Sequence, residues 1–111
     1  ELGTSEQDYQ RALELAKKAD QLNPDSPLVL DTLGWALYRT GDVQGAIEKI
    51  EQANERMPGN ESIAAHLGEV YHRLGQKEKA RAALEKVAAT DKDFLGRERA
   101  VELYKKEYEG G

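Results

Sequence analysis

Landmark residues recur along this chain at an interval of thirty-four positions, and this interval restricts the possible folds more than any other feature. Five pairs and three triplets share it: Pro24 and Pro58; Leu33 and Leu67; Gly34 and Gly68; Arg39 and Arg73; Gly41 and Gly75; Ala12, Ala46 and Ala80; Ala16, Ile50 and Leu84; Ala19, Ala53 and Val87. A period in this range is typical of stacked supersecondary units that bury their apolar faces against one another. Charged residues make up 33% of the chain and aromatic residues 6%, which suits helices with narrow apolar stripes. The sequence therefore predicts an all-α fold.

Turn signals and helical periodicity divide the 111 residues into segments. A helix from Asp8 to Leu22 is predicted because its apolar residues recur at spacings of three and four, and the prolines that follow end it. The last predicted helix, about Arg97 to Glu107, is polar, as expected of the terminal element of a repeat array. The predicted organisation is a disordered or truncated lead-in (1–7), the second helix of an incomplete repeat (8–26), two complete repeats (27–60 and 61–94), a C-terminal capping helix (95–109) and a tail (110–111).

Two glycines fall inside predicted helices, at equivalent positions of the two complete repeats. Glycine within a helix costs about 1 kcal/mol relative to alanine, so a helix that carries it twice at equivalent positions is expected to need the space. We predict that Gly34 and Gly68 lie where the two helices of a pair cross, facing Ala46 and Ala80. The other structural landmarks are turn residues that end helices: Gly41, Gly75, Pro24 and Pro58.

The pattern formed by Leu33-Gly34, Leu37, Gly41-Asp42, Ala46, Ile50, Ala53 and Pro58 resembles the tetratricopeptide repeat, over roughly residues 8–94. The resemblance implies a right-handed superhelical stack of antiparallel helix hairpins, with about two and a half repeats plus the capping helix. It also implies a non-catalytic module that binds a protein or peptide in a concave groove. The segments Leu30–Asp42 and Ala65–Val70 are in addition similar to the C-terminal repeats of large bacterial tetratricopeptide proteins associated with envelope assembly, exopolysaccharide export and exosortase sorting.

The first helix of the first complete repeat is apolar on two sides. At about 100° per residue, Leu30, Leu33 and Leu37 form one stripe, which is the expected core face. A second stripe lies on nearly the opposite side, and a helix that is apolar on both sides is either central or carries a binding surface. The second stripe consists of Leu28, Asp31, Trp35, Tyr38 and Arg39, and its equivalents in the next repeat are Ser62, Ala65, Glu69, His72 and Arg73.

The resemblance implies that these ten residues line the concave groove. Trp35 and Tyr38 would be aromatic anchors, and Tyr, Trp and Arg are the residue types that concentrate binding energy. The hydrogen-bond donors would be Arg39, His72 and Arg73, and the acceptors would be Asp31 and Glu69. The alternative is that Trp35 or Leu28 packs on the first helix of a preceding repeat. A clamp for a chaperone carboxylate is not expected, because Asp31, Trp35, Ala65 and Glu69 stand where such clamps use Lys and Asn.

Other classes of function find little support in the sequence. A net charge of −5 and the lack of a basic run argue against nucleic acid as a partner, and no apolar run is long enough for membrane insertion. His66 and Glu69 have the spacing of half a metal site, but no second cluster supplies further ligands. We therefore expect no enzyme activity, no metal and no cofactor.

Two alternatives remain beside a binding module: a homo-oligomerisation or scaffolding segment, and an arm that presents substrate to an enzyme domain of the same chain. The cytoplasm and the bacterial periplasm or envelope are both compatible with the composition.

Overall fold

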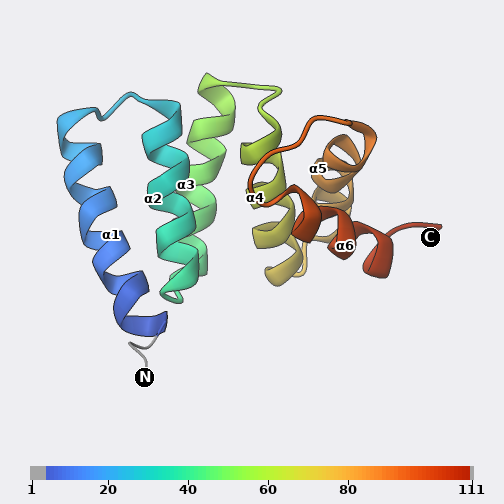
Figure 1. The fold of residues 1–111 in the computed structure, drawn as a ribbon, viewed down its shortest axis with the longest axis horizontal. Coiled ribbons are helices and arrows are strands. Elements are labelled where there is room, and N and C mark those ends of the chain that lie inside the picture. The colour runs from blue at the N-terminus through green and yellow to red at the C-terminus, as the bar shows by residue number, and fades with distance from the viewer. Residues whose placement is uncertain (1–4, 111) are drawn as a thin grey trace. The chain divides into compact units, whose positions relative to one another are not determined.

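The computed structural model describes residues 5–110, and this part of the chain is helical. It contains α1 (Ser5–Leu22), α2 (Pro27–Arg39), α3 (Val43–Arg56), α4 (Glu61–Arg73), α5 (Lys77–Ala89) and α6 (Arg97–Glu107) (Figure 1). The chain divides into two compact units, which we call unit 1 (Glu1–Met57) and unit 2 (Pro58–Gly111). The predicted all-α class is confirmed, and the helix pairs α2–α3 and α4–α5 fall within the two predicted repeats.

The helix boundaries follow from the capping residues. The side chains of Ser26, Asp42 and Asn60 accept hydrogen bonds from the backbone N–H groups three residues later, at 3.3, 2.8 and 3.0 Å, and so satisfy donors that have no partner inside the helix. The α2–α3 turn places Gly41 at a φ of 103°, a left-handed conformation that favours glycine.

One predicted boundary was wrong. Helix α1 begins at Ser5 rather than at Asp8, so Asp8 lies within the first turn of the helix and not at its start. An acidic side chain in the first turn still interacts favourably with the helix dipole. The rest of the predicted lead-in, residues 1–4, and Gly111 of the predicted tail lie outside the described residues.

Unit 1 consists of the α2–α3 hairpin with α1 packed on α2. Leu13 and Ala16 of α1 pack against Leu33 and Ala36 of α2. On the α3 side, Ala46, Ile50 and Ala53 are completely buried. A Cβ atom placed on Gly34 would overlap Cγ1 of Ile50 and would lie 3.1 Å from the carbonyl oxygen of Ala46. Gly34 therefore lies at the helix crossing as predicted, but it accommodates mainly Ile50.

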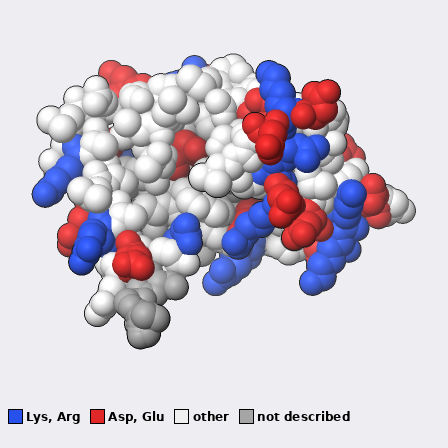
Figure 2. Space-filling view, viewed as in Figure 1, with Lys and Arg blue, Asp and Glu red and all other residues white. Residues whose placement is uncertain are grey.

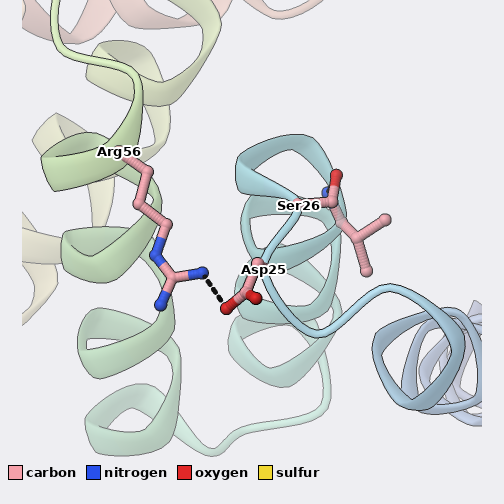
Figure 3. Close-up of polar contacts among 4 residues, drawn as sticks. Asp25, Ser26 and Arg56 are labelled. Carbon is pink, nitrogen blue, oxygen red and sulfur yellow. Dashed lines mark hydrogen bonds and ion pairs between the residues drawn. The ribbon is translucent and has the colours of Figure 1, made fainter.

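An ion pair also joins two parts of unit 1. Arg56 Nη1, at the end of α3, lies 2.8 Å from Asp25 Oδ1 in the turn before α2 (Figure 3). The Asp25 side chain is 90% exposed and the Arg56 side chain 42%, and exposed pairs of this kind contribute about 1 kcal/mol or less. The ion pair therefore contributes little to the stability of unit 1.

Unit 2 consists of the α4–α5 hairpin with α6 packed on both helices. Ala80, Leu84 and Val87 of α5 are completely buried. A Cβ atom on Gly68 would overlap the side chain of Leu84. The expectation that Gly68 faces Ala80 is therefore corrected: the residue nearest to it is one turn further along α5.

Candidate functional site

The five residues predicted to form a stripe on α2 do not share one environment. Asp31 is buried, with 6% of its surface exposed, and Leu28 and Arg39 are exposed. Trp35 and Tyr38 are partly buried, and their rings stack with centroids 5.0 Å apart. The stripe therefore separates into a buried acidic residue, an exposed leucine near the start of α2, and an aromatic and arginine cluster near its end.

A small cavity lies at that cluster, between α1 and α2, and we call it the α1–α2 cleft. Its volume is about 130 Å³, its surface is almost entirely apolar, and its lining consists of Tyr9, Ala12, Thr32, Trp35, Ala36 and Arg39. Only Trp35 and Arg39 of these six were predicted as site residues. Tyr9 and Ala12 belong to the helix predicted from its apolar spacing over Asp8–Leu22, and their three-residue spacing on that helix is the sequence signal that could have found them.

Arg39 lies at the edge of the cleft against an aromatic ring. Its guanidinium carbon is 4.0 Å from the centroid of the Tyr9 ring, a cation–π arrangement. Within the residues that the structure describes, Arg39 makes no ion pair and no hydrogen bond. The cleft thus combines an apolar cavity with a cation whose hydrogen-bond donors point to no carboxylate of the described chain.

Two of the five equivalent residues of α4, Glu69 and His72, are engaged by α6 and by Tyr108, the residue that follows it. Arg99 donates two hydrogen bonds to the Glu69 carboxylate, from Nε to Oε1 at 2.8 Å and from Nη2 to Oε2 at 2.6 Å. Nδ1 of His72 is hydrogen-bonded to the Tyr108 hydroxyl at 2.7 Å. Ser62 and His72 are partly buried, Ala65 and Glu69 are buried, and Arg73 is exposed. Glu69 and His72, which were predicted to contact a partner, therefore bind the C-terminal segment of this chain. Their role in partner binding stays a prediction.

Charge is distributed differently over the two units. Figure 2 shows Lys, Arg, Asp and Glu side chains interleaved over the α6 segment of unit 2, whereas the upper part of unit 1 in the same view is mostly uncharged and its charged side chains lie mainly in the lower part. Interleaved charges are typical of a solvated face. The uncharged surface of unit 1 is the better candidate for a protein contact.

Burial changes the acidity of a tyrosine in unit 2. Tyr108 is 4% exposed. Burial, followed by the nearby Glu107 carboxylate, raises the pKa of Tyr108 above its usual value of 10.0, and Arg81 opposes the shift. The neutral phenol is therefore the form that the folded state favours next to His72.

This shift predicts a loss of stability at alkaline pH. Because the pKa of Tyr108 is higher in the folded protein, the unfolded chain loses its phenol proton first, so the contribution is present below pH 10.0 and is lost as the pH rises through the folded pKa. We expect the free energy of unfolding, measured by urea titration, to fall more steeply above about pH 10 in the native chain than in Tyr108→Phe. Equal slopes for the two proteins would contradict this assignment.

Residues 5–110 contain neither a cluster of metal ligands nor a helix suited to cross a membrane. Nowhere in this range do three His, Asp or Glu side chains gather as metal ligands. None of the helices in it combines the length and apolarity that crossing a membrane requires.

Comparison with known proteins places this geometry in a family. The chain is 49% identical over 61 residues to TPR repeat-containing protein PA4667 of Pseudomonas aeruginosa, a match that covers 55% of this chain and 10% of that protein. The chain thus spans about a tenth of the length of this relative. The crystal structure of the Sgt2 TPR domain from Aspergillus fumigatus matches with a TM-score of 0.74 and 24% identity, over 90% of this chain and 68% of that one, which shows the shared fold.

The family model for the tetratricopeptide repeat matches residues 4–50 and 37–106. Tetratricopeptide repeats generally mediate protein–protein interactions, bind proteins or peptides, and are typically non-enzymatic. The repeat interval, the paired helices and the glycine at each crossing agree with that match, and the chain belongs to the tetratricopeptide repeat family.

Proposed function

We propose that this chain is a non-catalytic binding module of a larger scaffold or assembly protein, and that it receives a peptide or helix of a partner protein at the α1–α2 cleft. The observation that carries the proposal is the cleft itself, an apolar cavity of about 130 Å³ beside the Arg39 guanidinium. An apolar cavity of about 150 Å³ holds a benzene-sized group. The cleft therefore fits one medium-sized apolar side chain.

The residue types around the cleft support the same function. Tyr, Trp and Arg are enriched among the residues that dominate interface energies, and here Tyr9, Trp35, Tyr38 and Arg39 lie together. Arg39 offers its donors to a carboxylate or carbonyl of the partner. In unit 2 the equivalent Glu69 and His72 hold α6, so the cleft of unit 1 is the stronger candidate for the anchoring contact.

The proposal predicts that binding depends on the aromatic pair. We expect the native chain to retain a protein from a lysate of the source organism, and Trp35→Ala/Tyr38→Ala to lose it. Calorimetric titration of the purified partner is expected to show a loss of affinity of roughly 30-fold or more, as for hot-spot residues worth at least about 2 kcal/mol. Gln44→Ala/Glu48→Ala, at exposed positions of α3, is the matched control and is expected to bind normally.

Both variants are compared with the native chain by circular dichroism and thermal midpoint, so that unfolding is not mistaken for lost contact. Equal affinity of all three proteins for the purified partner would overturn the proposed site.

A second candidate function, self-association, is favoured by exposed leucines of α1: Leu15 is 61% and Leu22 80% exposed. A concentration-dependent mass in sedimentation equilibrium would support it, and a constant monomer mass would refute it.

A further inference from the structure

Helix α6 packs on α4 and α5 (Figure 1), and its contact with α4 includes a two-pronged pair with the Glu69 carboxylate. Arg99 donates to the two carboxylate oxygens from Nε and Nη2, at 2.8 and 2.6 Å. The Glu69 side chain is 11% exposed, whereas the Arg99 side chain is 70% exposed. The carboxylate is therefore built into the surface of α4, and the guanidinium lies over it from outside. The planar fork of a guanidinium matches a carboxylate as an ammonium group does not.

Helix α6 has little buried apolar surface of its own. Ala100 is its buried residue, and the other residues of Arg97–Glu107 are partly or fully exposed. The helix begins after Gly96 without a side-chain cap, and its length is 11 residues, which is shorter than the ~12–15 residues that an isolated helix needs in water. A region with few buried apolar contacts opens at a low cost in free energy. The contacts with the rest of unit 2 therefore decide whether α6 stays in place.

Residues 90–96, which join α6 to α5, are not helical. This connection can change direction while Lys77–Ala89 stays helical. Just after α6, Tyr108 is 4% exposed, and its hydroxyl is hydrogen-bonded to Nδ1 of His72 at 2.7 Å. Glu69 and His72 thus hold the two ends of one segment, residues 97–108, which we call the C-terminal segment.

The two residues of α4 that hold the C-terminal segment are the repeat equivalents of the aromatic pair on α2. Thirty-four positions separate Trp35 from Glu69, and the same interval separates Tyr38 from His72. In unit 1, Trp35 lines the α1–α2 cleft and Tyr38 stacks on it. In unit 2, side chains of the C-terminal segment engage the corresponding positions. The segment therefore occupies positions whose equivalents in unit 1 belong to the proposed binding site.

We propose that the C-terminal segment is autoinhibitory: Arg99 occupies Glu69 in place of an arginine of a partner protein, which binds α4 when the segment has left it. The ligand class is a peptide segment that presents an arginine, because Glu69 already receives a guanidinium in the two-pronged form. A mostly buried carboxylate without a partner is costly, so release of Arg99 is coupled to the arrival of another cation. The inference rests on the proposed function for the protein nature of the ligand, and it concerns unit 2 alone.

The test supplies the arginine in a peptide of known sequence. A fluorescent synthetic peptide of residues 95–109 is titrated with the full chain, and binding is followed by anisotropy. In the native chain the tethered segment competes with the peptide, so the peptide binds only the fraction of molecules in which the segment has left α4. Arg99→Ala in the chain is expected to raise that fraction and to lower the apparent Kd by roughly fivefold or more. Lys105→Ala, at an exposed position of the same helix, is the matched control and should bind as the native chain does.

Two further comparisons assign the interaction to its atoms. Glu69→Gln/Arg99→Ala is expected to lose the gain in affinity, because a neutral amide does not form the charge-assisted pair. A peptide that carries Arg99→Lys should bind the Arg99→Ala chain roughly tenfold more weakly than the original peptide does. Circular dichroism and thermal midpoints establish that each variant is folded. Arg99→Lys in the chain keeps the positive charge and gives the same comparison with a smaller expected gain.

The outcomes separate this inference from the proposed function. Equal apparent Kd values for the native chain, Arg99→Ala and Arg99→Lys would overturn the autoinhibition. A gain that survives in Glu69→Gln/Arg99→Ala would overturn Glu69 as the acceptor of the guanidinium, and equal binding of the two peptides would overturn the arginine requirement. None of these results alters the expected loss of partner affinity in Trp35→Ala/Tyr38→Ala, so the two proposals fail separately.

Discussion

Gly34→Leu is expected to lower the free energy of unfolding by about 1–3 kcal/mol, the usual cost of overpacking a core. The first added carbon already overlaps Cγ1 of Ile50, and the carbonyl oxygen of Ala46 lies 3.1 Å away. Both neighbours are fully buried and cannot move aside without displacing α3. The substitution is destabilising even though leucine forms helices better than glycine by nearly 1 kcal/mol. Urea titration, with Gln52→Leu at an exposed position of α3 as the control, measures the effect.

A double-mutant cycle locates the clash. Ile50→Ala alone is expected to cost about 2–5 kcal/mol, because it removes a completely buried side chain. Gly34→Leu/Ile50→Ala should cost less than the sum of the two single changes, since the new side chain occupies part of the cavity. Additive costs would show that the two residues do not meet. An unchanged thermal midpoint in Gly34→Leu would show that the crossing lies elsewhere.

Arg99→Ala is expected to lower the free energy of unfolding by about 1–2 kcal/mol and to release α6. Two charge-assisted hydrogen bonds to a mostly buried carboxylate are lost, and such bonds contribute about 1.5–3 kcal/mol each when shielded from water. The Arg99 side chain is 70% exposed, so solvent screening reduces that figure. Arg99→Lys should recover only part of the loss, because an ammonium group cannot reproduce the two-pronged contact.

Amide hydrogen exchange across α6 distinguishes release of the helix from a general loss of stability. Relative to the native chain, Arg99→Ala is expected to accelerate amide exchange by a larger factor in Arg97–Glu107 than in Val43–Arg56. Lys105→Ala, at an exposed position of the same helix, is the matched control and should leave exchange unchanged. A uniform acceleration over both units would show that the pair between Glu69 and Arg99 does not fix α6.

The helices themselves were predictable because their signals are local. Periodic apolar residues, caps such as Asp42 and Asn60, and glycines in left-handed turns act within a few residues of one another. The start of α1 was predicted three residues late, because the apolar periodicity that marks the helix begins only at Tyr9. The glycine at each crossing was predictable from its cost. The residue that each glycine faces was not predictable, because it depends on the offset of the two helices along their axes.

The candidate site was predicted only in part. The stripe on α2 pointed to Trp35, Tyr38 and Arg39, which the structure places at or beside the cleft. It also included Asp31, which is buried. Tyr9, which lines the cleft from α1, lies twenty-six residues before Trp35, and no local pattern links the two. The pairing of Glu69 with Arg99, thirty residues apart, was likewise not predictable from the sequence of either helix alone.

The sequence alone determined that this chain is a helical repeat and which residues recur at equivalent positions, because periodicity and helix propensity are properties of neighbouring residues. Only the tertiary structure decided which faces are occupied: Arg99 and Tyr108 engage Glu69 and His72 of α4, while α1 and α2 line a small apolar cleft. The reason is geometric. Packing against other helices determines which part of a stripe on one helix remains accessible as a surface.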